Sequence, residues 1–175
     1  MDALIVVDMQ AGLLNGEPKH DLRGVIERIN RLAARVRERS GVVIFVQHCS
    51  GPEDNFVPGT PGWALLPEFQ RADADIVILK TLNDPFVGTD LAARLKEIAP
   101  ERVLITGWAT DLCVDATVRS AVSNHYDVVV VMDAHTLNDR PHLDTASIIR
   151  HHHWVWSNLI TQRSVRLAHT DELLM

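Results

Sequence analysis

Three side chains with complementary chemistry, Asp8, Lys80 and Cys113, lie near the ends of short apolar segments. Asp8 and Lys80 each follow such a segment directly, and Cys113 follows another after a short turn. In an open parallel sheet, residues just beyond the carboxyl ends of the strands meet in one crevice. A carboxylate, an ammonium and a thiol in one crevice supply a base, a cation and a nucleophile, so the pattern predicts nucleophilic catalysis through Cys113.

The apolar segments are short and continuously apolar, which is typical of strands covered on both faces. We expect strands at residues 3–7, 42–46, 76–79, 103–106, 128–132 and 165–167. Between them, apolar residues recur at helical spacing, and we expect helices at about residues 21–39, 90–98, 112–124 and 143–159. Thr89 or Asp90 is the expected cap of the second helix. The alternation predicts an α/β fold, a three-layer α/β/α sandwich with a six-stranded parallel sheet.

The composition is that of an ordinary globular protein. The chain has 175 residues, 46% of them apolar and 23% charged, and we expect residues 1–175 to form a single domain. The net charge of −6 argues against a nucleic-acid partner. No apolar segment reaches the ~18 residues of a membrane span, and the N-terminus does not resemble a signal peptide. Two cysteines make no disulfide framework, so we expect a cytoplasmic protein.

The segment around Cys113 is the most specific in the chain. Residues 106–114 read as the end of a strand, a tight turn and the start of a helix. Thr110 or Asp111 can cap that helix, which would put Cys113 in its first turn. There we expect the backbone N–H groups and the helix dipole to stabilise a Cys113 thiolate and to bind a developing oxyanion.

Four segments in this order resemble the isochorismatase-like cysteine hydrolases, a family that includes nicotinamidases and N-carbamoylsarcosine amidohydrolase. They are Leu4–Gln10, Leu79–Thr81, Gly107–Val114 and Met132–Ala134. The resemblance implies that family's fold, with its Rossmann-like topology, and cleavage of an amide-type C–N bond through a covalent thioester. It assigns Cys113 as the nucleophile, Asp8 as the general base and Lys80 as the cation beside them. It also implies a cis peptide bond between Trp108 and Ala109, with the N–H groups of Ala109 and Cys113 as the oxyanion hole.

Each of the three residues has an ordinary explanation when taken alone: a helix cap, a solvated lysine and a small buried side chain. The catalytic interpretation depends on all three falling at strand ends that match the family positions together. Two other functions stay open. One is vinyl ether hydrolysis of the isochorismatase type, which needs no thiol. The other is a catalytically silent binding or redox-sensing protein in which Cys113 is oxidised.

Further side chains follow strand ends or lie in neighbouring loops, where they can line a substrate site. Trp108 is the best placed, because the nucleophile turn fixes its location. The other candidates are His48, Phe56, Trp63, Phe86, Leu112 and His135. Phe56 and Trp63 can equally anchor the Gly- and Pro-rich loop 48–62, and His48 can equally bond to the loop backbone. That loop can also close over the site as a lid.

We expect no metal and no cofactor. Nicotinamidases carry an Asp-x-His metal-binding pattern near the end of the second strand, but residues 47–50 here read Gln-His-Cys-Ser. The consecutive histidines 151–153 would point about 100° apart on a helix and could not chelate one ion together. With Trp154 and Trp156 they indicate a packing surface or a subunit contact. We therefore expect a homo-oligomer, dimer or tetramer, that takes a small-molecule amide as substrate.

Overall fold

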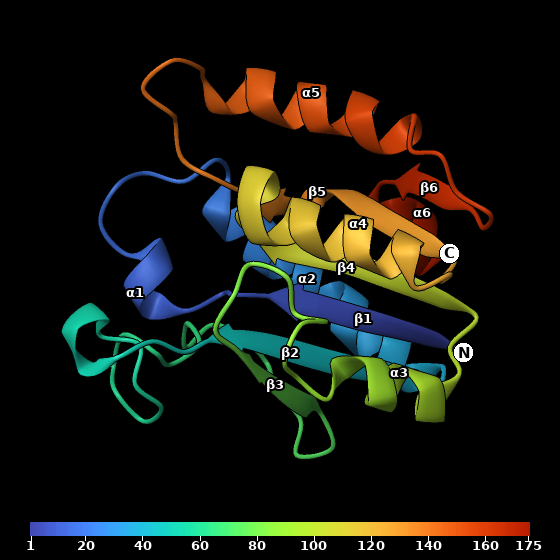
Figure 1. The fold of residues 1–175 in the computed structure, drawn as a ribbon, viewed down its shortest axis with the longest axis horizontal. Coiled ribbons are helices and arrows are strands. Elements are labelled where there is room, and N and C mark those ends of the chain that lie inside the picture. The colour runs from blue at the N-terminus through green and yellow to red at the C-terminus, as the bar shows by residue number, and fades with distance from the viewer.

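A computed structural model describes all 175 residues, and it contains the predicted six-stranded parallel sheet. The strand order is β3-β2-β1-β4-β5-β6, and every neighbouring pair is parallel (Figure 1). The strands are β1 Asp2–Val7, β2 Val42–His48, β3 Ile76–Lys80, β4 Arg102–Trp108, β5 Val128–Thr136 and β6 Val165–Ala168. The helices are α1 Ala11–Leu14, α2 Leu22–Glu38, α3 Leu91–Ile98, α4 Asp115–Ser123, α5 Thr145–Ser157 and α6 Thr170–Leu174. The predicted α/β fold is confirmed.

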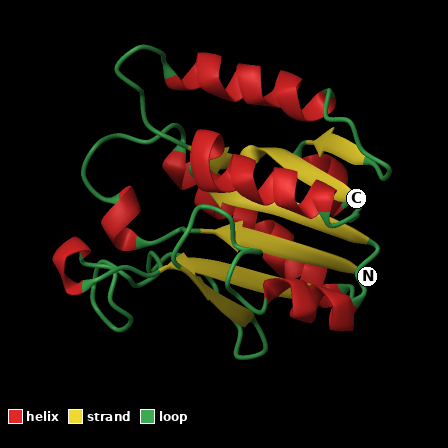
Figure 2. Cartoon of the chain, in the orientation of Figure 1, coloured by secondary structure: helices red, strands yellow, loops and turns green.

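Helices cover both faces of the sheet, so the chain forms three layers (Figure 2). Alternate residues of β1 enter two separate cores: Leu4 and Val6 pack with the apolar stripe of α2, whereas Ile5 and Val7 pack with residues of α3 and α4. Both cores bury their apolar side chains almost completely. This two-sided burial is the physical reason why the strands are continuously apolar in the sequence.

The central strands β1 and β4 approach each other closely near their carboxyl ends. Gly107 of β4 pairs with Val7 of β1 and has a φ of 118°. A Cβ atom on Gly107 would lie 2.2 Å from the Val7 carbonyl oxygen. Only glycine therefore allows this conformation at this spacing. The contact fixes the position of the turn after β4 relative to the residue after β1.

Some sequence predictions need correction. The helix expected at 112–124 begins later, because residues Thr110–Val114 form a π-helical turn and α4 starts at Asp115. The short helices α1 and α6 were not expected, and β5 runs further than residue 132. Helices of four or five residues are too short to show a helical period in the sequence. None of the helices has both the length and the apolar character needed to cross a membrane.

Candidate active site

The structure brings Asp8, Lys80 and Cys113 together at the carboxyl ends of β1, β3 and β4. Nζ of Lys80 lies 2.7 Å from Oδ2 of Asp8 and 3.4 Å from Sγ of Cys113. The same ammonium donates to the carbonyl of Leu82 at 3.0 Å. Asp8 has a φ of 51°, so its backbone turns sharply just after β1. These contacts place a base, a cation and a thiol within reach of one another.

Burial dominates the electrostatics of this cluster. It raises the pKa of Asp8 above the usual range of a carboxyl group, and the neighbouring Lys80 opposes that shift only in part. It also raises the pKa of the Cys113 thiol to about 12, with Asp8 adding to the effect and Lys80 opposing it. Burial therefore opposes the expected resting thiolate, because the charged form of Cys113 would lose its hydration and face a carboxylate.

The turn that carries Cys113 is held by neighbours rather than by a helix cap. Neither Thr110 nor Asp111 caps a helix here, so that expectation is wrong. The Thr110 hydroxyl instead bonds to Nδ1 of His135 at 2.9 Å. The Asp111 carboxylate accepts two hydrogen bonds from the Arg140 guanidinium at 2.7 and 2.8 Å, and this contact lowers the pKa of Asp111. Both side chains are thus occupied by segments that lie after β4 in the sequence.

The backbone around Ala109 bears on the predicted oxyanion site. The Trp108–Ala109 peptide bond is cis. The Ala109 carbonyl accepts from the N–H groups of Leu112 and Val114 at 3.0 and 3.1 Å. The Ala109 N–H itself donates to no backbone acceptor. It is therefore free to bind an oxygen atom of a ligand.

A pocket of about 190 Å³ opens beside Asp8 and Cys113. Of the predicted wall residues, it is lined by His48, Trp108 and Leu112, and Ala109 also faces it. Two further lining residues, Leu13 of α1 and Asn83 after β3, were not predicted. Nothing in the sequence pattern distinguishes these two from other loop residues.

The other predicted wall residues, Phe56, Trp63, Phe86 and His135, do not line this pocket. Phe56 packs edge-on against His48, with 5.8 Å between ring centroids, and the Trp63 indole donates to the Cys49 sulfur at 3.3 Å. Both therefore anchor the loop after β2, as the alternative interpretation had it. Phe86 packs with the α3–α4 core. The side chain of His135 is buried behind the nucleophile turn.

His48 is held in place through its own backbone. The buried Gln10 side chain accepts from the His48 N–H at 2.7 Å and donates to the His48 carbonyl at 3.0 Å. It also donates to the Trp63 carbonyl at 2.9 Å. Burial, together with the nearby Lys80 charge, lowers the pKa of His48. Its ring therefore faces the pocket as a neutral imidazole at pH 7.

The consecutive histidines of α5 do not gather into a metal site, and no group of three or more metal-ligating side chains occurs in the structure. His153 contacts His135 with 3.0 Å between Nε2 atoms, whereas His152 bonds to the Ile148 carbonyl at 2.9 Å. Trp156 is completely buried and its indole donates to Asp115 at 2.8 Å, but Trp154 is 65% exposed. Most of this segment therefore serves packing within the chain.

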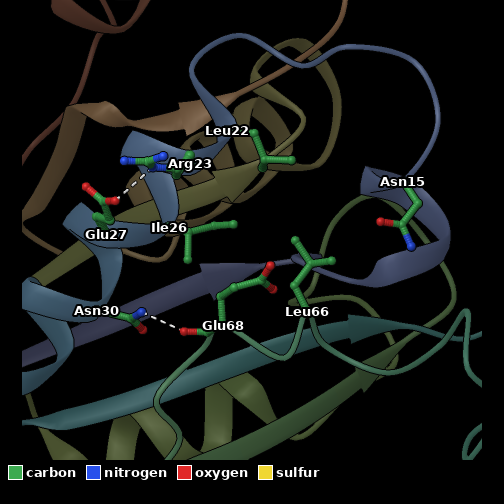
Figure 3. A pocket seen from close by; sticks show the side chains of 8 residues that line it. All are labelled: Asn15, Leu22, Arg23, Ile26, Glu27, Asn30, Leu66 and Glu68. Carbon is green, nitrogen blue, oxygen red and sulfur yellow. Dashed lines mark hydrogen bonds and ion pairs between the residues drawn. The ribbon is translucent and has the colours of Figure 1, made fainter.

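A larger cavity of about 540 Å³ lies elsewhere, between α2 and the segment around Leu66 (Figure 3). Two polar contacts lie along its walls: Arg23 pairs with Glu27 at 3.2 Å, and Asn30 donates to the Glu68 carbonyl at 2.8 Å. It contains no thiol and no imidazole. The smaller pocket beside Cys113 is therefore the one that adjoins the candidate catalytic side chains.

The chain resembles known proteins over most of its length. The family model of the isochorismatase domain matches residues 2–155. Streptothricin hydrolase from Streptomyces noursei is 32% identical over 142 residues, which are 81% of this chain and 51% of that protein, so the chain spans about half the length of this relative. Ureidoacrylate amidohydrolase from Variovorax paradoxus is 28% identical over 171 residues, covering 75% of this chain and 67% of that protein.

A solved structure described as an isochorismatase family protein has the same architecture. It superposes with a TM-score of 0.86 at 29% identity, covering 95% of this chain and 97% of the other. Together with the fold and the cluster at the strand ends, these matches show that the chain belongs to the isochorismatase family.

Proposed function

We propose that the protein hydrolyses a C–N bond of a small amide through a thioester on Cys113. The observation that carries this proposal is the position of the Lys80 ammonium, 2.7 Å from the Asp8 carboxylate and 3.4 Å from the Cys113 sulfur, beside a small pocket. The relatives named as a streptothricin hydrolase and a ureidoacrylate amidohydrolase support this class of reaction.

The first step is attack of the Cys113 sulfur on the amide carbonyl carbon. Asp8 accepts the thiol proton during this attack, because a thiol with a pKa of about 12 does not ionise beforehand at neutral pH. The raised pKa of Asp8 makes its carboxylate a stronger base than an exposed one. Lys80 stays next to the negative charge as it passes from carboxylate to sulfur.

The negative charge then moves to the substrate oxygen. We assign its stabilisation to the N–H groups of Ala109 and Cys113, and loss of one such donor costs on the order of 10²-fold in turnover. Protonated Asp8 gives its proton to the leaving nitrogen as the C–N bond breaks, which leaves a thioester and a free amine or ammonia. Water then attacks the thioester, Asp8 takes its proton, and a carboxylic acid and the Cys113 thiol are released.

The pocket walls indicate the kind of substrate. Leu13, Trp108 and Leu112 give it apolar surface, whereas His48 and Asn83 offer hydrogen-bonding groups. No arginine lines the pocket, and the ammonium of Lys80 is already paired with Asp8. A volume of about 190 Å³ with this lining fits a small, uncharged amide with an apolar substituent.

The two alternatives make different demands on Cys113. Vinyl ether hydrolysis does not use the thiol, so it would survive replacement of Cys113 by alanine. A redox sensor needs a thiolate of low pKa, and burial here raises the pKa of Cys113 instead. This electrostatic difference favours the hydrolase.

The test is release of ammonia or amine from a panel of small uncharged amides. We expect turnover by the wild-type protein, loss of at least ~10³-fold in Cys113→Ala, and unchanged turnover in Lys96→Ala, which changes an exposed lysine of α3. Intact-mass spectrometry of acid-quenched wild type should show an acyl adduct on Cys113. Turnover that persists in Cys113→Ala, or a panel with no substrate at all, would contradict the proposal.

A further inference from the structure

A chain of three polar side chains connects helix α5 to the turn that carries Cys113. Oγ1 of Thr110 lies 2.9 Å from Nδ1 of His135, and Nε2 of His135 lies 3.0 Å from Nε2 of His153. Thr110 and His135 are almost completely buried. The reaction described above uses none of these three side chains, so their burial needs another explanation.

The two imidazoles can share only one proton along this chain. Burial lowers the pKa of His135 to about 3 and also lowers the pKa of His153, so both rings are neutral at pH 7. A neutral imidazole has one N–H donor and one acceptor nitrogen, so one Nε2 must donate to the other. The Thr110 hydroxyl can both donate and accept, so it can bond to Nδ1 of His135 whether that nitrogen is the donor or the acceptor.

Packing fixes the His135 ring in the orientation that this chain needs. The ring of Trp156 stands edge-on to it, with 5.4 Å between centroids and an angle of 85°, and the His153 ring meets it at 89°. Trp156 is itself completely buried and bonded to Asp115 of α4. His135 is therefore a rigid partner for Thr110.

Thr110 is one residue away from the proposed oxyanion donor. Its backbone N–H belongs to the peptide unit of the Ala109 carbonyl, which accepts from Leu112 and Val114. A shift of the Thr110 backbone would tilt this peptide unit. Because the Ala109 Cα joins that unit to the Ala109 N–H, the shift would also change the direction of this N–H. A hydrogen bond that holds the Thr110 side chain thus acts on the geometry of the oxyanion site.

We propose that His135 is a positioning residue, which fixes the nucleophile turn by bonding to Thr110 and is itself oriented by His153. This inference rests on the proposed function only for its kinetic part. The residue was expected to line the substrate pocket, and its place behind the turn gives it this different task. The proposal concerns turnover rather than substrate affinity, because none of the three side chains reaches the pocket.

The kinetic test compares Thr110→Val, which keeps the side-chain shape and removes the hydroxyl, with Thr110→Ser, which keeps the hydroxyl. For the Val variant we expect kcat to fall about 10-fold or more with KM changed less than about twofold, and we expect the Ser variant to recover most of kcat. The matched control is Thr106→Val, which also removes a buried hydroxyl. The Thr106 hydroxyl donates to the Ile5 carbonyl with a hydrogen-bond length of 3.0 Å, and neither residue belongs to the turn. Equal losses in Thr110→Val and Thr106→Val, or a loss confined to KM, would overturn the proposal.

A second measurement does not depend on activity. In protein labelled with ¹⁵N-histidine, we expect one downfield N–H resonance, protected from exchange, for the proton between His135 and His153. It should disappear in His153→Phe and persist in His152→Phe, because His152 bonds to the Ile148 carbonyl instead. Absence of a protected imidazole N–H in the wild type would overturn the proposed hydrogen bonds from Thr110 through His135 to His153. If the resonance is present but no amide is hydrolysed, the proposed function fails and these hydrogen bonds stand.

Discussion

Asp8 and Lys80 form a buried ion pair, with 2.7 Å between Oδ2 and Nζ and side-chain exposures of 1% and 0%. Removal of both charges from water is costly, and their mutual attraction offsets that cost only while both are present. This pair and the Cys113 thiol beside it affect stability, alkylation and pH dependence. Gly107 and Gln10 hold the backbone around them.

Replacement of one partner of the pair should destabilise the fold. For Lys80→Met we expect a loss of about 3–5 kcal/mol in the free energy of unfolding at pH 7, because Asp8 is left buried without its counter-charge. The double variant Asp8→Leu/Lys80→Met should recover most of this stability but no activity. Urea unfolding checks both, with Arg94→Met as control, since Arg94 and Asp90 form an exposed pair expected to contribute less than about 1 kcal/mol. A Lys80→Met loss no larger than that of the control would argue against the buried pair.

Alkylation should reveal the raised pKa of Cys113. In a Cys49→Ser background, the rate of reaction with iodoacetamide should still rise with pH above 9 without a plateau, because the folded thiol has a pKa of about 12 rather than 9.0. In urea the rate should level off above about pH 9, the ordinary range of a free thiol. A plateau below pH 9 in the folded protein would show a thiolate that burial does not suppress.

The same shift makes stability depend on pH. The folded state binds the Cys113 proton more tightly than the unfolded state does. The contribution of this proton to the free energy of unfolding is therefore fully present below pH 9.0 and is lost as the pH rises toward about 12. We therefore expect the unfolding free energy of the wild type to fall more steeply across this range than that of Cys113→Ala. Parallel curves for the two proteins would contradict the assignment.

Gly107→Ala should be strongly destabilising. The added Cβ would meet the Val7 carbonyl oxygen at 2.2 Å in a backbone with φ 118°, so both a clash and backbone strain oppose it. We expect a loss of more than about 3 kcal/mol in urea unfolding. Gly59→Ala isolates the strain of positive φ without a clash and should cost about 1 kcal/mol, whereas Gly51→Ala meets neither and should be nearly neutral. Similar values for all three variants would argue against the close approach of β4 to β1.

Gln10→Met should loosen the pocket wall at His48. The variant keeps the volume of the buried side chain but leaves the His48 N–H and carbonyl without their partners, at a cost of about 2–4 kcal/mol in unfolding free energy. We expect KM to rise as well, because His48 lines the pocket. Gln47→Met is the control, since Gln47 is also buried and bonds to the Trp63 carbonyl but not to His48. A KM effect of equal size in both variants would assign it to the loop at Trp63.

The amino-acid sequence was sufficient to predict the sheet and the meeting of Asp8, Lys80 and Cys113. A strand buried on both faces must be apolar along most of its length, so the central strands β1, β2, β4 and β5 are visible as short apolar runs. Parallel connection then places the residues just after each strand at one edge of the sheet. These are local patterns combined with one topological rule, and they require no knowledge of side-chain packing.

Tertiary structure alone decided the surroundings that raise the pKa of Cys113 and the neighbours of His135. Helix context predicted a thiolate, but the pKa depends on how much water the fold excludes and on the distance to Asp8, which the order of residues does not encode. His135 comes after the apolar start of β5 in the sequence just as a pocket residue would. Its ring instead meets Thr110 and His153, because the direction of a side chain and its neighbours from distant segments are set only when the layers pack together.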